Sequence, residues 1–186
     1  MTDQHMKESI KDHVLEQVLD AEKFKGFYLK PPDGGRMMST LIIFHPEGIT
    51  ICGDLCPGLH GNCSAYGYSL GWFAGKLSGS YLCEKFLEKS WQRELAAQWC
   101  KDEAQEQRKE GNPEIADKLE TLGSRDLECG DMDVRDFYER LTEISVGYVD
   151  DGVPGHGYDP GEKGWLCAIQ EKFAELYNAR TPAPAQ

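Results

Sequence analysis

The sequence predicts an α+β fold, in which a small antiparallel sheet, with a β-hairpin at about residues 38–55, packs against about five α-helices. The first observation is the apolar content: 40% of the 186 residues are hydrophobic and 10% are aromatic, which is enough to form a core. The second is the order along the chain, because β-branched apolar runs come early and apolar residues at helical spacing follow. The length fits a single domain over residues 1–180, and the alternating Pro and Ala of residues 181–186 predict a flexible tail.

The first element is expected to be an amphipathic helix at residues 8–24. Apolar residues recur there at spacings of four, four and three, and Gly26 would end the helix. These apolar residues are Ile10, Val14, Val18 and Ala21. A short strand is expected next at residues 27–29, and Pro31 would end it.

The hairpin is the clearest pattern in the sequence. Residues 38–44 and 49–55 are apolar, β-branched runs separated by the four residues His45-Pro46-Glu47-Gly48, whose Pro and Gly suit a tight turn. Seven glycines then fall within residues 53–79, which argues against a continuous helix or strand. This stretch is therefore expected to be a structured loop with one short helix around residues 72–77.

Helical patterns fill the second half of the chain. A long helix is expected from Ser78 or Ser80 to Glu110, because apolar residues recur within it every four positions. Three further helices are expected over residues 112–122, 134–144 and 159–176, and each follows a residue type that caps helix N-termini. These capping residues are Asn112, Asp131 or Asp133, and Asp159.

The charge balance restricts the classes of partner. Twenty Lys and Arg residues stand against 32 Asp and Glu residues, a formal charge of −12, so no direct contact with nucleic acid is expected, because such contact requires a basic face. No run of about 18 apolar residues is present, and the start of the sequence has no export signal, so no membrane contact is expected. Seven cysteines, an odd number, favour reduced thiols and a cytoplasmic location.

Residues 52–63 gather three cysteines and one histidine, and this cluster is the candidate for chemistry. The ligand spacing differs from that of zinc sites, so no metal and no cofactor are expected, and a core cysteine followed by a thiol-bearing turn is the favoured interpretation. A nucleophilic interpretation takes Cys56 as the thiolate and His60 or His45 as its base. Asp54 would then orient the base. No signature of a known enzyme family surrounds Cys56, so the sequence favours a protein that is not an enzyme without deciding the question.

Two further clusters are candidates for partner binding. Residues 64–72 interleave aromatic rings with Gly and Ser, a mixture typical of binding loops, although the favoured interpretation of the rings is that they cover the core beneath the loop. The aromatic candidates are Tyr66, Tyr68 and Trp72. The second cluster holds the carboxylates of Asp150, Asp151, Asp159 and Glu162, which form either an acidic patch for a basic partner or a solvated loop; calcium is disfavoured because the spacing of an EF-hand loop is absent.

Several segments that together span about half of the chain carry a resemblance to known sequences. The segments that carry the resemblance are residues 53–58, Tyr66-Gly67-Tyr68, residues 71–78 with 81–87, and Gly164-Trp165-Leu166-Cys167-Ala168. They are similar to uncharacterised small accessory proteins of tailed phages and prophages. The resemblance implies a protein encoded by a phage that works in the host cell cytoplasm on host machinery, including defence systems; it implies no activity and no catalytic residue.

These observations together predict an acidic interaction protein that binds and inhibits a host factor, such as a nucleic-acid-handling defence nuclease, through its negative charge and its aromatic loop. The alternative is a small hydrolase or metal-dependent enzyme that uses the turn at residues 52–63. A third interpretation is a structural phage component in which the exposed helix around residues 101–110 docks neighbours. The sequence leaves the oligomeric state and the identity of the partner open.

Overall fold

The computed structural model describes residues 3–35, 37–62, 69–127, 132–144 and 154–180. The fold is α+β, as predicted, and the chain divides into two compact units. Unit 1 comprises residues 1–88 and 158–186, and unit 2 comprises residues 89–157, which lie between the two parts of unit 1 in the sequence. The single domain expected over residues 1–180 stays a prediction, because two compact units can still fold cooperatively. The tail at 181–186 lies outside the described residues.

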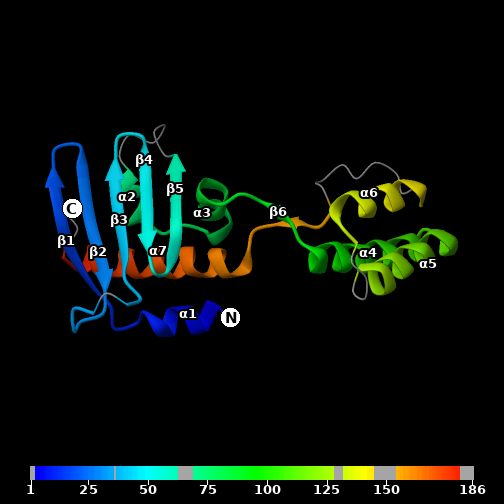
Figure 1. The fold of residues 1–186 in the computed structure, drawn as a ribbon, viewed down its shortest axis with the longest axis horizontal. Helices are drawn as coiled ribbons and strands as arrows, with labels where there is room; N and C mark the ends of the chain where they lie inside the picture. Colours follow the sequence, from blue (N-terminus) through cyan, green and yellow to red (C-terminus); the bar gives the residue numbers. More distant parts are fainter. Residues whose placement is uncertain (1–2, 36, 63–68, 128–131, 145–153, 181–186) are drawn as a thin grey trace. The chain divides into compact units, whose positions relative to one another are not determined.

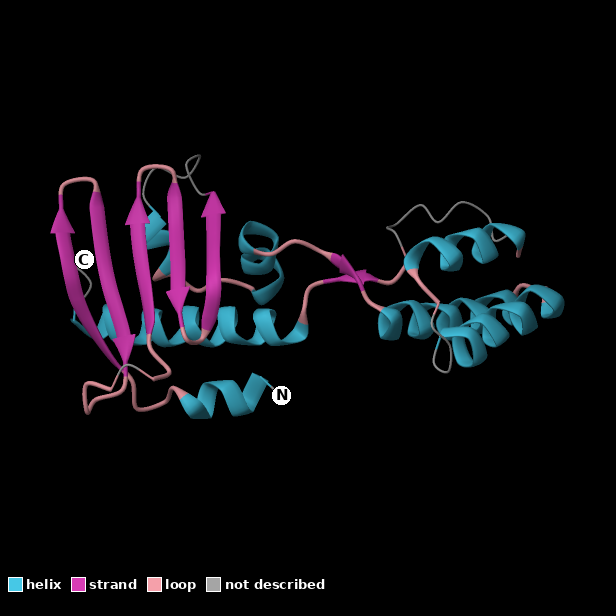
Figure 2. Ribbon diagram, viewed as in Figure 1, coloured by secondary structure: helices cyan, strands magenta, loops and turns pink. Residues whose placement is uncertain are grey.

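A five-stranded antiparallel meander forms the sheet of unit 1 (Figures 1 and 2). Neighbouring strands in the sheet are also neighbours in the sequence. The strands are β1 (Val14–Ala21), β2 (Phe24–Lys30), β3 (Thr40–His45), β4 (Gly48–Gly53) and β5 (Cys56–Asn62). The predicted hairpin is confirmed, since β3 and β4 pair from Thr40 opposite Gly53 to His45 opposite Gly48.

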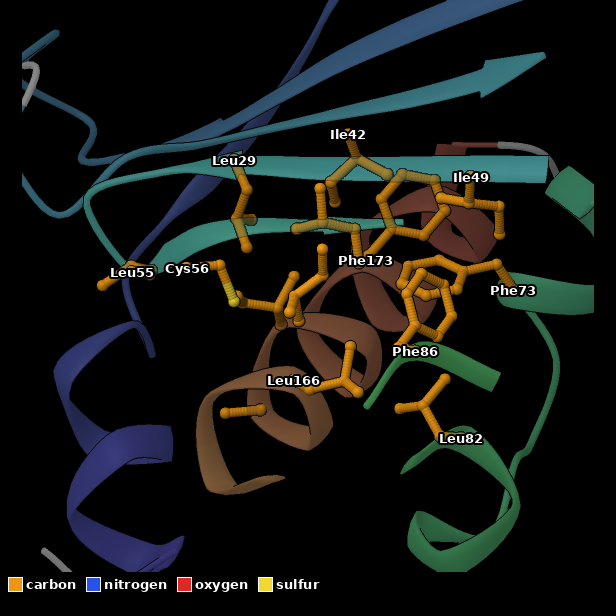
Figure 3. Packing of buried hydrophobic residues seen from close by; sticks show 14 of the residues in the cluster. Leu29, Ile42, Ile49, Leu55, Cys56, Phe73, Leu82, Phe86, Leu166 and Phe173 are labelled. Atoms are coloured by element: carbon orange, nitrogen blue, oxygen red, sulfur yellow. The ribbon is translucent and has the colours of Figure 1, made fainter. Parts of the chain in front are cut away.

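The helices of unit 1 that contact the sheet cover one of its faces. They are α2 (Ser69–Phe73), α3 (Gly79–Phe86) and α7 (Pro160–Arg180), and a further helix, α1 (Asp3–Ser9), packs on α7. Figure 1 shows α7 running behind the sheet. The core between the two layers is rich in aromatic residues, and Figure 3 shows the Phe173 side chain of α7 among them. The ring centroid of Phe173 lies 5.3 Å from that of Phe27, 5.4 Å from that of Phe44 and 5.4 Å from that of Phe73.

Unit 2 is mainly helical and has its own core. Its elements are β6 (Ser90–Trp91), α4 (Arg93–Lys109), α5 (Pro113–Thr121), the π-helical segment η2 (Leu122–Leu127), α6 (Val134–Glu143) and β7 (His156–Gly157), which pairs with β6. The predicted starts of α5 and α6 are confirmed. Pro113 begins α5, but the side chain of Asn112 before it makes no capping hydrogen bond. Asp133 caps α6 by accepting the backbone N–H of Arg135 at 2.8 Å and of Asp136 at 3.0 Å.

The prediction of a helix at residues 8–24 is wrong. The helix α1 ends at Ser9, and residues 14–21 form the edge strand β1 instead. The apolar positions 14 and 18 fit a period of four, but they fit the period of two in a strand as well, and pairing with β2 decides between the two. The short strand expected at 27–29 is part of this pairing and extends over the whole of β2.

The prediction of one continuous helix up to Glu110 is also wrong. Its first part, α3, ends at Phe86, and the backbone is extended at Leu87 before the chain enters unit 2. The apolar stripe is divided between two cores, because Leu87 is buried in unit 1 whereas Trp91 and Trp99 pack in unit 2.

Two smaller expectations also change. The glycine-rich loop expected over residues 53–79 contains the strand β5, and the short helix expected around 72–77 occupies Ser69–Phe73 instead. The described residues hold seven α-helices rather than about five.

Candidate functional site

The candidate nucleophile Cys56 lies inside the core of unit 1. Its side chain is 1% exposed, and Figure 3 shows it among apolar side chains such as Leu29 and Leu166. Burial, with a smaller contribution from the carboxylate of Glu162, raises the pKa of the Cys56 thiol to about 12. The thiol is therefore protonated at neutral pH, whereas a nucleophilic cysteine must be a thiolate.

A bulge in β5 separates Cys56 from its candidate base. Leu59 pairs with Ile51, but Cys56 pairs with Gly53, so the β5 side of the ladder has one more residue here than the β4 side. Gly58, at φ +114°, lies within this bulge. Cys56 and Leu59 are consequently both buried, whereas His60 is exposed. Cys56 and His60 thus face opposite sides of the sheet and are not brought together.

The third candidate, Asp54, lies in the turn between β4 and β5. Its side chain is exposed, and its backbone N–H donates a hydrogen bond to the carbonyl of Ser39 at 3.0 Å. The described residues contain no group of three or more His, Cys, Asp or Glu side chains placed to hold a metal ion. Cys63, the last cysteine of the predicted cluster, lies outside the described residues.

His60 instead belongs to a polar cluster across three strands. The rings of His45 and His60 stack with their centroids 5.3 Å apart and their planes at 16°. The hydroxyl of Thr50 lies 3.2 Å from Nε2 of His45 and 3.2 Å from Nδ1 of His60, so it can donate to one ring and accept from the other. The sequence placed both histidines near Cys56; the strand register places them beside each other.

The residues predicted to bind a partner are only partly described. Tyr66, Tyr68, Asp150 and Asp151 lie outside the described residues. Trp72 on α2 is half-buried, and its ring packs on the rings of Phe73 and Tyr81 with centroids 6.3 and 5.9 Å away.

Asp159 is exposed and caps the N-terminus of α7. Its Oδ1 accepts the backbone N–H of Glu162 at 2.9 Å, and its carbonyl accepts that of Lys163 at 2.9 Å. The Asp159 carboxylate therefore has a structural role, because it accepts a hydrogen bond from an N–H group that the start of a helix leaves unpaired. The DP dipeptide at residues 159–160 is the sequence signal for this cap.

The sheet face opposite α2, α3 and α7, called the outer face here, carries exposed apolar side chains. Val14, Leu19, Phe24 and Tyr28 are 38%, 41%, 46% and 37% exposed, although large apolar side chains are usually buried. The strand register places Tyr28 beside the half-buried Leu41, and the half-buried Ile43 lies two residues further along β3. The sequence pattern does not indicate this face, because Val14 and Val18 fit a helical spacing and Phe24 falls at the end of the helix that this spacing predicts.

A hollow of about 500 Å³ adjoins the outer face where the β2–β3 loop meets the β4–β5 turn. Tyr28, Lys30, Leu41, Cys52 and Asp54 contribute to its lining. The positive charge of Lys30 is offset by an ion pair with Glu16, which lies on the neighbouring strand β1. The hollow therefore offers a mixed apolar and polar lining beside the exposed rings.

The loop beside the hollow is held by a buried histidine. The backbone of Met38 has φ +63°, which a residue other than glycine seldom adopts. Its carbonyl lies 2.8 Å from Nε2 of His13, whose side chain is buried. This contact provides a fixed polar partner for the strained backbone.

The two units carry different charge densities. Unit 2 holds 17 acidic and 9 basic residues, a formal charge of −8 over 69 residues. Unit 1 holds 15 acidic and 11 basic residues, a formal charge of −4 over 117 residues. Ion pairs offset part of the acidity of unit 2: Arg108 binds Asp117 and Glu120, and this raises the pKa of Arg108 and lowers that of Glu120.

Comparison with known proteins identified no relative of this chain. No protein-family model matches the chain, and neither a curated protein nor a solved structure does so. Among the described residues, no helix has the length and apolar character needed to cross a membrane.

Proposed function

We propose that this chain is a protein-binding protein and that the outer face of its sheet is the docking surface. The observation that carries the proposal is the set of exposed apolar side chains on that face: Val14, Leu19, Phe24 and Tyr28. Contiguous apolar surface on a protein is typical of an interaction site, and aromatic residues at its centre supply most of the binding free energy.

Features of the two edge strands favour docking on the face over strand addition at an edge. The ladder between β1 and β2 has a bulge between Gln17 and Leu19, and the carboxylates of Glu16 and Asp20 on β1 are held in ion pairs. The other edge strand, β5, carries Pro57 and its own bulge. Bulges, charges and proline are the features by which edge strands resist pairing with another chain.

The partner in this proposal is a basic protein. The formal charge of −12 repels nucleic acid and attracts basic surfaces, and most of that charge lies in unit 2. Together with the resemblance to phage accessory proteins, it supports a phage-encoded inhibitor of a host factor in the host cytoplasm, such as a nuclease with a basic nucleic-acid channel. In this proposal charge accelerates association, and the apolar face supplies affinity.

Affinity capture from host lysate tests the proposal. The double variant Leu19→Ser with Phe24→Ser should lower the affinity for the captured protein at least about tenfold, because each apolar anchor contributes about 1 kcal/mol or more. Val134→Ser is the matched control, since Val134 is 39% exposed but lies in unit 2. Capture that survives the double variant unchanged, or that is insensitive to salt, would contradict the proposal.

A further inference from the structure

Two cysteine thiols from different helices meet in unit 1. Cys83 on α3 and Cys167 on α7 are joined by a side-chain hydrogen bond. The close approach of the helices depends on Gly79, because a Cβ at that position would lie 3.1 Å from Sγ of Cys167.

The two thiols differ in access to solvent. Cys83 is fully buried, whereas Cys167 is half-buried, so Cys167 is the more accessible residue of the pair. Burial raises the pKa of Cys83, while the nearby amine of Lys163 and the hydrogen bond with Cys167 act in the opposite direction. Cys167 is therefore the thiol that reacts first, and Cys83 is the thiol that resolves the product.

We propose that Cys83 and Cys167 form a reversible disulfide when the protein meets a small-molecule disulfide such as oxidised glutathione. The thiolate of Cys167 attacks one sulfur of that disulfide and displaces one glutathione thiolate, which forms a mixed disulfide. Cys83 then loses its proton and attacks Sγ of Cys167, which displaces the second glutathione thiolate. Two protein thiols are oxidised, one external disulfide is reduced, and the two protons pass to the released thiolates.

The position of the pair in the sequence gives the cross-link a consequence. Cys83 lies five residues before the chain leaves unit 1 at Glu88, and Cys167 lies nine residues after it returns at Tyr158. The disulfide would close a loop that contains all of unit 2. It would join α3 to α7 covalently, so the helical layer of unit 1 would stay together if unit 2 unfolded.

The test uses the full chain, treated with oxidised glutathione without denaturant. We expect a loss of two free thiols, a peptide that links Cys83 to Cys167, and a rise in Tm of about 10 °C that dithiothreitol reverses, because a long closed loop restricts the unfolded chain. Cys167→Ser should abolish all three effects, whereas the matched control Cys52→Ser should retain them, since Cys52 is also half-buried but lies on β4.

Peptide mapping of the oxidised chain without substitutions gives a result that does not depend on how the variants fold. Glutathione attached to Cys167 without the internal cross-link would overturn the proposal. So would a cross-link that forms only in denaturant, or a cross-link between other cysteines.

Discussion

Both units bury aromatic and aliphatic side chains, but the helix at the centre of each core contributes different residues. In unit 1 the rings of Phe27, Phe44 and Phe73 surround Phe173, and a sheet supports them. In unit 2 the helix α4 buries small side chains, which lets neighbouring elements approach its backbone. These small residues are Ala96, Ala97, Cys100 and Ala104. Truncating a large buried ring leaves a cavity, whereas enlarging a small residue at a close contact causes overpacking, so both changes are destabilising.

The two units also differ in the chemistry of their surfaces. Unit 1 presents an apolar sheet face, and unit 2 presents twice the net negative charge on fewer residues. A single partner could use both properties, because buried apolar area sets affinity while charge sets the association rate. In the proposed function, the apolar face of unit 1 therefore supplies affinity and the charge of unit 2 accelerates association.

The largest expected effect is the removal of the central ring of unit 1. Phe173→Ala should lower the free energy of unfolding by about 4 kcal/mol, because a large buried side chain is lost and a cavity remains. Chemical denaturation gives the size of the effect, and hydrogen exchange shows which amides lose protection. If the amides of unit 2 lose protection as much as those of unit 1, the two units unfold together. The difference between their cores would then not produce separate stabilities.

The second effect tests the opposite sensitivity of unit 2. Gly123→Ala would place a Cβ 2.9 Å from Cβ of Cys100 and 3.2 Å from the carbonyl of Ala97, so it should cost about 1–3 kcal/mol by overpacking. Gly71→Ala on α2 is the control, because nothing lies within 4 Å of its Cβ. It should be neutral or slightly stabilising in the same denaturation experiment. Equal losses in the two variants would refute close packing as the cause.

The third effect is shared by both units. Burial raises the pKa of the Cys56 and Cys100 thiols to about 12, from an ordinary value of 9.0. The unfolded chain releases these protons near pH 9 while the folded chain keeps them, so stability is full below pH 9 and falls as pH rises towards 12. Each thiol should lower the free energy of unfolding by about 1 kcal/mol between pH 8 and 10.

Denaturation in a reducing buffer measures this slope, and Cys56→Ala or Cys100→Ala should each remove its own share. A slope that both variants leave intact would assign the alkaline sensitivity to other groups.

The smallest effect concerns the charged surface of unit 2. Arg108→Gln removes the ion pairs to Asp117 and Glu120, yet exposed pairs contribute little, so the denaturation midpoint should not change measurably. The pKa of Glu120 should rise towards its ordinary value, because hydrogen bonding to Arg108 is what lowers it. Carbon-detected NMR titration of the carboxylate reads this directly. A large loss of stability would show that unit 2 depends on its charge network.

Local signals predicted a substantial part of the fold. The hairpin of β3 and β4 follows from two apolar runs around a Pro-Glu-Gly turn, and the start of α6 follows from a capping Asp133. Both are confirmed because the interactions concerned join residues that are close in the sequence. The strand β5 was missed for the opposite reason, since its bulge disrupts the alternation that identifies strands.

The candidate site could be predicted far less well. Cys56, His60 and Asp54 are close in sequence, but one bulge sends Cys56 into the core and His60 to the outer face. Conversely, Leu19 and Tyr28 share a face only because β1 pairs with β2. The contact between Cys83 and Cys167 likewise joins residues on either side of unit 2.

The amino-acid sequence by itself determined the fold class, the hairpin, the capped start of α6 and the acidic charge, because composition and short-range hydrogen bonding decide these. Only the tertiary structure decided that residues 14–21 form a strand, that the stripe from Leu87 to Trp99 serves two cores, and that the outer face carries exposed rings. Each of these depends on which surface a residue packs against, and an apolar spacing does not specify that surface.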